Sequence, residues 1–210
     1  MEVLRIEGGP WNQNCFLVIN ENSSVLIDPG GNALGILDVI RTRDLKLLAI
    51  LNTHGHFDHI GAVCEIVGET SSRFFISGKE KPIMRSSNML RFIFKHKEKI
   101  SVPTQFEDLD NCGFDLSFID LHFRLVHTPG HTPGGFCFII EDHIFTGDTV
   151  LSSMPGSAEL PGGNIDDLKT SLDYLATLDG DLVAHPGHGR DSKLSQALNL
   201  SQNWLNSRSV

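Results

Sequence analysis

The chain has 210 residues and a composition ordinary for a globular protein, with 40% of residues apolar and 20% charged. Its formal net charge is −9 at pH 7, which disfavours nucleic acid as a partner because proteins that bind phosphate backbones usually carry a basic surface. No run of 18 apolar residues is present, so we expect no membrane-spanning segment. The length suits one domain over residues 1–210.

The N-terminus and the cysteines together favour a cytoplasmic protein. The opening residues, MEVLRIEGGPWN, contain neither the basic region nor the apolar region of a signal peptide. The four cysteines form no CxxC pair and are typical of reduced thiols in the cytosol. We therefore expect a cytoplasmic location.

The predicted elements alternate between strands and helices along the chain. In the first half we predict strands over 16–19 and 25–27, a helix over 32–40, a buried strand over 45–51, a helix after residue 59 and a strand over 73–77. In the second half we predict two strands within 116–126, strands over 136–140 and 144–146, a helix over 165–178, a strand over 182–184 and a helix over 194–205. This alternation indicates an α/β fold.

Two of the predicted hairpins are similar to each other. NCFLVIN–ENSS–VLIDPG and GGFCFII–EDH–IFTGDT each have a second strand that ends in an acid, Asp28 in the first and Asp148 in the second. Two related β-rich halves suggest two sheets packed face to face. The acids would then meet at a shared edge of the sheets.

The segment LNTHGHFDHIGA (51–62) joins a predicted strand to a predicted helix and holds a dense group of possible metal ligands. Such loops, at the carboxyl ends of strands, are where open α/β sheets bind ligands. Histidine is the commonest metal ligand, and His54 and His56, two residues apart, can face one ion. The adjacent Asp58 and His59 must diverge and could serve a second ion. By itself, this cluster could equally be a solvated loop.

Three further candidate ligands follow later strands and weaken the solvated-loop interpretation. They are His131 in HTPGHTPGG, Asp148 in FTGDT and His188 in AHPGHG. Each lies beside Gly or Pro, which favour tight turns. With the first loop they make five histidines and two carboxylates, enough for two nitrogen–oxygen sites if one carboxylate bridges. This set suits zinc, and also iron or manganese.

The whole series resembles the metallo-β-lactamase superfamily, whose motif is HxHxDH followed by a separate His, Asp and His. The match extends from Asp28 to His188. The segments LPGGNIDDLKTSL and DLVAHPGHG are similar to those of single-domain glyoxalase II-like (hydroxyacylglutathione hydrolase-like) hydrolases. The resemblance implies a four-layer αββα sandwich of two mixed β-sheets flanked by helices, with the site at one edge of the sheets.

The resemblance also implies a role for each residue of the series. It assigns seven ligands to two divalent ions, with Zn²⁺ as the first choice and Fe or Mn as alternatives. These are His54, His56 and His131 for the first ion, Asp58, His59 and His188 for the second, and Asp148 as the bridge. Asp58 and Asp148 are also the predicted catalytic carboxylates. Asp28, in LIDPG, matches an acid that orients the HxHxDH loop without binding metal.

The expected reaction is hydrolysis of a small thioester or ester by metal-bound hydroxide. A metal ion lowers the pKa of bound water from 15.7 to about 7, and a pair of ions about 3.5–4 Å apart can also polarise a carbonyl. A thiolate leaves readily, because the pKa of a thiol is about 8.5, far below that of an alcohol. The sequence contains no further residue that must act as a general acid, which favours a thioester.

Two features depart from the glyoxalase II-like pattern. Ser157 occupies the position where such enzymes often carry a base that holds glutathione, and the C-terminal helical domain of the larger enzymes is not expected, since about twenty residues follow His188. The segment 79–99, with seven Lys or Arg against two Glu, could bind an anionic substrate in place of that base. The preferred interpretation is a solvated helix that covers four apolar residues, Met84, Leu90, Phe92 and Phe94.

Several alternatives remain beside the thioesterase. A lactonase or another carboxylic-ester hydrolase would use the same two-metal site. An iron-dependent persulfide dioxygenase is disfavoured because it uses a reduced ligand set, whereas Asp58, His59 and His188 are all present. A secreted β-lactamase would need a signal peptide, and a nuclease a basic face. We further expect Trp11 and Phe57 either to line the mouth of the site or simply to pack there.

Overall fold

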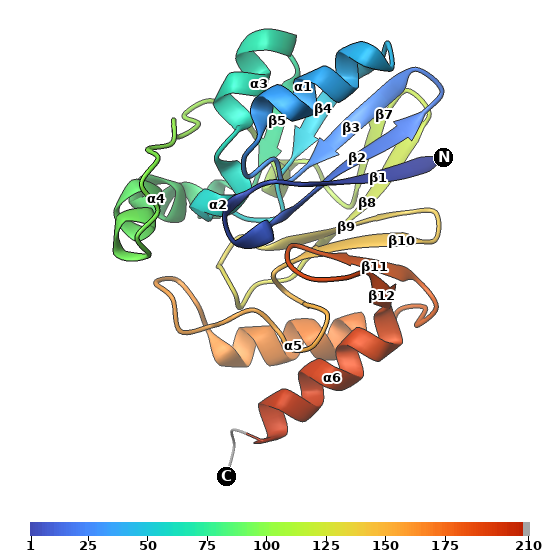
Figure 1. Ribbon diagram of the computed structural model, residues 1–210. Helices are drawn as coiled ribbons and strands as arrows, with labels where there is room; N and C mark the ends of the chain where they lie inside the picture. The colour runs from blue at the N-terminus through green and yellow to red at the C-terminus, as the bar shows by residue number, and fades with distance from the viewer. Residues whose placement is uncertain (208–210) are drawn as a thin grey trace.

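The computed structural model describes residues 1–207, and these form four layers (Figure 1). Two six-stranded mixed sheets pack face to face in the middle. Helices α1 and α3 lie on the outer side of the first sheet, and α5 and α6 lie on the outer side of the second (Figure 1). This is the αββα sandwich that the resemblance implied, so the predicted α/β class and architecture are confirmed.

The first sheet has the strand order β1-β2-β3-β4-β5-β6. Its strands are β1 (Glu2–Glu7), β2 (Asn14–Asn20), β3 (Ser23–Ile27), β4 (Lys46–Leu51), β5 (Arg73–Ile76) and β6 (Glu107–Asp108). Strands β3 to β6 run parallel to one another. The segments that follow β3, β4 and β5 therefore leave the sheet at the same edge.

The second sheet has the order β12-β11-β10-β9-β8-β7. Its strands are β7 (Asp115–Phe118), β8 (Leu121–His127), β9 (Phe136–Ile140), β10 (His143–Gly147), β11 (Val183–Pro186) and β12 (Ser192–Lys193). The two similar hairpins of the sequence are β2–β3 and β9–β10, one in each sheet, and each is followed by a parallel strand. The expectation of two sheets packed face to face is confirmed.

The predicted helices are present with shifted ends, but Asp58 and His59 lie on the short helix α2 rather than on the expected loop. They are α1 (Ala33–Thr42), α2 (Phe57–Ile60), α3 (Val63–Thr70), α4 (Lys81–Ile93), α5 (Ile165–Leu175) and α6 (Leu194–Ser207), with short 3₁₀ turns η1 (Pro10–Asn12), η2 (Gly78–Glu80) and η3 (Leu109–Asn111). At the start of α5 the side chain of Asn164 accepts from the backbone amides of Asp166 and Asp167, as an N-cap does. Helix α5 ends at Leu175 rather than at residue 178.

Three apolar layers hold the sandwich together: one between the first sheet and its helices, one between the sheets, and one under α5 and α6. Strand β4 contributes Ile50 to the outer layer and Ala49 and Leu51 to the layer between the sheets. Because β4 is buried on both faces, its sequence is a continuous apolar run rather than an alternating one. No helix within residues 1–207 is both long and apolar enough to cross a bilayer.

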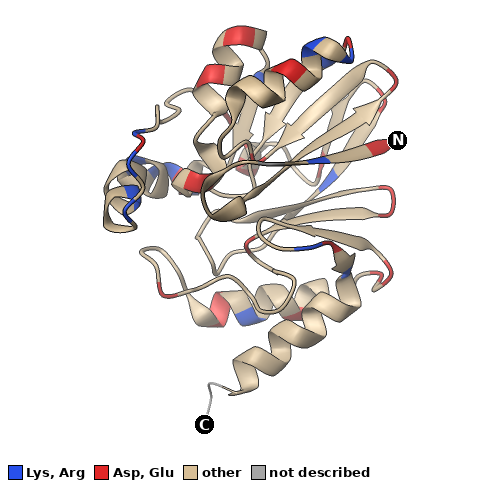
Figure 2. Ribbon diagram, in the orientation of Figure 1, with Lys and Arg blue, Asp and Glu red and all other residues tan. Residues whose placement is uncertain are grey.

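Three strands and one helical segment differ from the sequence expectations. Strands β1, β6 and β12 are not among the predicted strands, and Val3, Leu4 and Ile6 are only partly buried in β1. Segment 79–99 does contain a solvated helix, α4, but only Met84 and Leu90 of the four apolar residues are buried. Phe92 is 75% exposed and Phe94 39% exposed, so the expected cover over these two residues is wrong. Basic side chains gather on α4 and the segment after it (Figure 2).

Candidate metal centre

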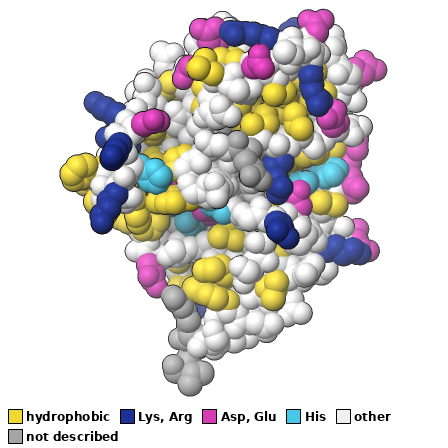
Figure 3. Space-filling view, in the orientation of Figure 1, with side chains coloured by type: hydrophobic (Ala, Val, Ile, Leu, Met, Phe, Trp, Pro, Cys, Tyr) yellow, Lys and Arg dark blue, Asp and Glu magenta, His cyan; other side chains and the backbone are white. Residues whose placement is uncertain are grey.

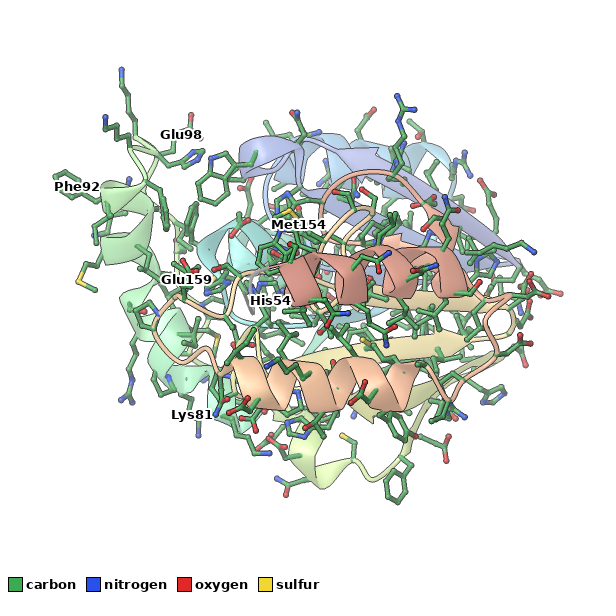
Figure 4. All side chains as sticks on the ribbon, turned by 90° about the horizontal axis from the view of Figure 1, so that it is seen from below. His54, Lys81, Phe92, Glu98, Met154 and Glu159 are labelled. Atoms are coloured by element: carbon green, nitrogen blue, oxygen red, sulfur yellow. The ribbon has the colours of Figure 1, made fainter. Side chains whose placement is uncertain are left out.

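The predicted ligands come together at the edge of the sandwich where strands from both sheets end, close to α2 in Figure 1. The HGHFDH segment leaves β4 and continues into α2, whereas His131 lies between β8 and β9. Asp148 follows β10 and His188 follows β11. Gly187 lets these segments approach closely, because a Cβ there would lie 2.3 Å from Oδ1 of Asp148. Figure 4 shows His54 inside the molecule, while Phe92 and Glu98 project from its rim.

The first cluster consists of His54, His56 and His131, with one ring nitrogen of each within 4.8 Å of the others. Nε2 of His131 lies 3.0 Å from Nδ1 of His56. All three side chains are buried. These are the residues that the family resemblance assigned to the first ion.

The second cluster consists of Asp58, His59 and His188, again with ligand atoms within 4.8 Å of one another. Oδ2 of Asp58 lies 3.2 Å from Nε2 of His188 and 3.7 Å from Nε2 of His59. Although adjacent in sequence to Asp58, His59 reaches the cluster from a different direction, since α2 begins at Phe57 and separates the two side chains around the helix axis.

Asp148 lies between the two clusters. Its Oδ1 is 3.5 Å from Nε2 of His59, and its Oδ2 is 3.7 Å from Nε2 of His131 and 3.8 Å from Nε2 of His188. One carboxylate thus faces ligands of both clusters, which is the placement that a bridging ligand requires.

The donor set fits divalent metal ions. Within residues 1–207, Nε2 of His54, Nε2 of His59 and Oδ1 of Asp148 are buried polar atoms with no hydrogen-bond partner. Buried polar atoms are nearly always paired, because leaving them unpaired is costly. A cation in contact with these atoms would satisfy them, and imidazole with carboxylate suits zinc, iron or manganese. The clusters can therefore hold metal, while the role of each residue as a ligand stays a prediction.

Asp28 holds the loop that carries the first ligands. It is 2% exposed, and its carboxylate accepts from the backbone amide of Thr53 at 2.7 Å and from the Thr53 hydroxyl at 2.6 Å. The same carboxylate lies 3.0 Å from Nδ1 of His59. If Nδ1–H donates to Asp28, Nε2 of His59 is left free for a metal. Its effect on metal binding stays a prediction.

The backbone of Ser157 orients His131 in the same manner. Nδ1 of His131 lies 2.7 Å from the Ser157 carbonyl oxygen, which can only accept, so Nδ1 carries the proton and Nε2 faces the centre. The sequence singled out Ser157 for its missing basic side chain. In the structure its main chain belongs to the site as well.

The pKa values divide the histidines into two groups. Burial lowers the pKa of His54 and His131, and lowers that of His56 to about 3, with further lowering by neighbouring imidazoles. These rings are neutral near pH 7 and have a lone pair to offer. Burial also lowers the pKa of His59, but the surrounding carboxylates, Asp148 foremost, outweigh it and raise the pKa well above its ordinary value.

Glu80 is a buried residue beside the centre that the sequence interpretation missed. It is 0% exposed. Its Oε2 accepts from the amide of Gly55 at 2.8 Å and its Oε1 from the amide of Gly134 at 2.7 Å. Burial raises the pKa of this carboxyl, and the amide hydrogen bonds act against that rise. One signal was available, since Glu80, like the other acids of the site, comes shortly after a buried strand.

An aromatic group lies next to the second cluster. The Trp11 ring is 5.2 Å from Phe57, 5.3 Å from Phe94 and 4.8 Å from His96, and the Trp11 carbonyl lies 3.4 Å from Nδ1 of His188. A cavity of about 850 Å³ lined in part by Phe57 and His96 opens beside this group. Trp11 is 49% exposed, which agrees with a place at the mouth. In Figure 3 histidines and hydrophobic side chains lie along the middle of the molecule, next to basic side chains.

The histidines outside the predicted series lie elsewhere. His127 ends β8, with Nε2 3.2 Å from the Pro133 carbonyl oxygen. His143 and His185 contact each other, with Nδ1 to Nε2 at 2.8 Å. His122 is bound to Ser117. None of these four is in the two clusters described above.

The comparisons with known proteins agree with this geometry. The model of the metallo-beta-lactamase superfamily matches residues 8–188. The hydroxyacylglutathione hydrolase GloC of Haemophilus influenzae is 29% identical over 208 residues, which cover 95% of each chain.

Two solved structures have nearly the same fold. The di-iron-bound form of TTHA1623 has a TM-score of 0.85 and 29% identity, and the match covers 95% of this chain and 98% of that one. The BLEG-1 B3 metallo-beta-lactamase has a TM-score of 0.86 and 28% identity, covering 94% and 97%. From its fold, its clusters and the family model, this chain belongs to the metallo-beta-lactamase superfamily.

Proposed function

We propose that this chain is a metal-dependent hydrolase that uses two divalent ions to cleave small thioesters. The observation that carries the proposal is the position of Asp148, whose oxygens lie 3.5–3.8 Å from ligand atoms of both clusters. When bound, a pair of ions supplies Lewis acidity toward a carbonyl and a water of lowered pKa. Both are what hydrolysis of an acyl bond needs.

The protein's own contribution is to orient and shield the ligands. The carboxylate of Asp28 and the carbonyl of Ser157 each hold one nitrogen of a histidine, so that the opposite nitrogen of His59 and of His131 is directed inward. Such outer partners fix the tautomer and the ring orientation. His54 is 2% exposed and His56 5% exposed, so the first cluster is shielded from bulk water, which strengthens electrostatic interactions inside it.

The chemistry near the centre favours a thioester over poorer leaving groups. Glu80 is a buried carboxyl beside the ligands that is not itself in the set, and both its oxygens already accept backbone amides. It is therefore unsuited to give a proton to a leaving alkoxide or amine. A thiolate needs little protonation, because the pKa of its conjugate acid is about 8.5. The similarity to GloC supports the same substrate class.

Zinc is the first candidate for the native metal, since the nitrogen–oxygen donor set suits it. The di-iron form of TTHA1623 supports iron as the alternative. The second candidate function is hydrolysis of a lactone or another carboxylic ester on the same centre, and the similarity to the BLEG-1 B3 metallo-beta-lactamase adds hydrolysis of a β-lactam. That reaction expels an amine or an alkoxide, which requires a proton donor that the thioester reaction does not need.

A matched substrate panel tests the proposal. Protein loaded with Zn²⁺ or with Fe²⁺ would be given a glutathione thioester, the oxygen ester of the same acid, a γ-lactone and a β-lactam. We expect the highest kcat/KM for the thioester, and a lactone or β-lactam cleaved faster would reject the substrate class. His122→Ala, which removes an exposed histidine outside the clusters, should keep both metal content and activity.

A further inference from the structure

Glu80 is the last residue of η2, the turn that follows β5, and lies directly before α4. Its side chain is 0% exposed, although the surrounding segment 79–99 is strongly basic and mostly solvated. Lys81, the next residue, lies on the periphery in Figure 4. A carboxylate turned inward from such a segment indicates a specific partner.

Its partners include two backbone amides, from loops that belong to different sheets. Gly55, between His54 and His56, belongs to the segment that leaves β4 of the first sheet, and its N–H donates to Oε2. Gly134 belongs to the segment between β8 and β9 of the second sheet, three residues after His131, and its N–H donates to Oε1. One carboxylate thereby joins the two loops that carry the whole first cluster.

Glycine at both positions allows this approach. A Cβ on Gly55 would lie 3.0 Å from Oε2 of Glu80, and a Cβ on Gly134 would lie 2.8 Å from Oε1 and 2.6 Å from the Ser77 hydroxyl. Another link between the same sheets is a backbone hydrogen bond from the Phe136 amide to the Thr53 carbonyl at 2.9 Å. Because that link does not involve Glu80, a change at Glu80 should loosen the loops without preventing folding.

We propose that Glu80 is a positioning residue that sets the spacing of His54, His56 and His131 by joining the amides of Gly55 and Gly134. It acts through the backbone and contacts neither metal nor substrate. The inference rests on the proposed metal centre, but not on the identity of the substrate. Its specific consequence is that the first metal site depends on Glu80 far more than the second does.

Replacement by glutamine removes the carboxylate of Glu80 while keeping the size and the burial of the side chain. Glu80→Gln has almost the same shape but offers one acceptor oxygen, and its NH₂ group would face the other amide as donor against donor. We expect affinity at the first site to fall about 10–100-fold, the usual range for outer partners of metal ligands. Glu80→Ala, which leaves both amides without an acceptor, should lower it further.

Each site is measured alone in a background that disables the other. Zn²⁺ affinity at the first site is obtained by chelator competition in His188→Ala, and affinity at the second site in His131→Ala, each with and without Glu80→Gln. We expect a large drop in the first background and a change of less than about threefold in the second. Equal losses in both backgrounds, or no loss in the first, would overturn the proposal.

A metal-free measurement and two controls complete the test. Amide hydrogen exchange at Gly55 and Gly134 in chelator-treated protein should accelerate in Glu80→Gln, and unchanged exchange would contradict the proposed contacts. Glu107→Gln removes an exposed carboxylate paired with Arg73 and should alter neither readout. Leu205→Ala removes buried bulk in the layer under α6 and serves as a control for general destabilisation. If it lowers Zn²⁺ affinity at the first site as much as Glu80→Gln does, the loss is due to destabilisation and the proposal is overturned.

The outcome is separable from that of the proposed function. If wild-type protein binds two ions with the expected dependence on Glu80 but cleaves no thioester, only the substrate class is wrong. If it cleaves thioesters and Glu80→Gln changes no affinity, only the role of Glu80 is wrong.

Discussion

The His59 ring lies between two carboxylates that arrive from different sheets, with Nδ1 3.0 Å from Oδ2 of Asp28 and Nε2 3.5 Å from Oδ1 of Asp148. Asp28 follows β3 and Asp148 follows β10, the second strands of the two similar hairpins. The two acids that end the similar hairpins are therefore not equivalent in the structure. Asp28 contacts Nδ1 of His59, the outer nitrogen, whereas Asp148 lies near Nε2, the nitrogen that faces the metal centre.

This relationship gives a prediction for Asp28→Asn. Asparagine keeps the shape but loses the charge and one of the two acceptor oxygens, so it cannot serve both Thr53 and His59 as the carboxylate does. We expect a folded protein with a loss of about 10–100-fold in metal affinity or activity. Circular dichroism and chelator competition would measure both, with the exposed Asp173→Asn as the control. A loss below twofold would contradict this role.

Asp148→Ala and His188→Ala should differ in the number of ions lost. Asp148 lies near ligand atoms of both clusters, whereas His188 belongs to the second cluster, with Asp58 and His59. We expect elemental analysis of metal-replete protein to give about two ions per chain for wild type and a loss of both ions in Asp148→Ala. His188→Ala should keep the first ion. One ion in the wild type would contradict the two-metal site.

The exposed Ser157 side chain predicts weak recognition of glutathione. Because a contact made equally in the ground and transition states affects KM and spares kcat, we expect a high KM for S-lactoylglutathione and a lower KM in Ser157→Arg. The carbonyl that holds His131 is retained in this variant, so kcat should change little. Steady-state kinetics would test this, and tight binding of the substrate by the wild type would contradict it.

Acid should destabilise the metal-free protein partly through His56. Burial lowers its pKa from 6.5 to about 3, so between these pH values the unfolded chain binds one proton that the folded protein does not. The free energy of unfolding therefore rises with pH through this window, by about 1.4 kcal/mol per unit from this group, and the contribution is complete above about pH 6.5.

His56→Gln should remove this slope. Urea unfolding of chelator-treated wild type and variant at several values between about pH 4.5 and 6 would give the free energies to compare. We expect the slope of the unfolding free energy against pH to be smaller in the variant, by the amount that about one proton contributes. Equal slopes in the two proteins would mean that His56 is protonated in the folded state as well.

The fold class, the two related hairpins and the seven residues that cluster in the structure could all be identified along the sequence. These features are local: apolar runs specify strands, and short polar segments beside Gly or Pro specify the loops that follow them. The buried run of β4 and the ligand-rich loop after it are contiguous, so no tertiary information was needed to connect them. The edge strand β1 was not predicted because it is only partly buried and its apolar pattern is correspondingly weak. Strands β6 and β12, of 2 residues each, are too short to show an alternating pattern.

The link between the two loops of the first cluster could be recognised only in the folded molecule. Glu80 and Gly134 are 54 residues apart, and the partners of Glu80 are backbone amides, which every residue except proline carries and which leave no side-chain signature. The contact of the Ser157 carbonyl with His131 could not be predicted from the sequence for the same reason. The sequence shows which side chains are present. Which main-chain groups they contact depends on the segments that the packing of the two sheets brings together.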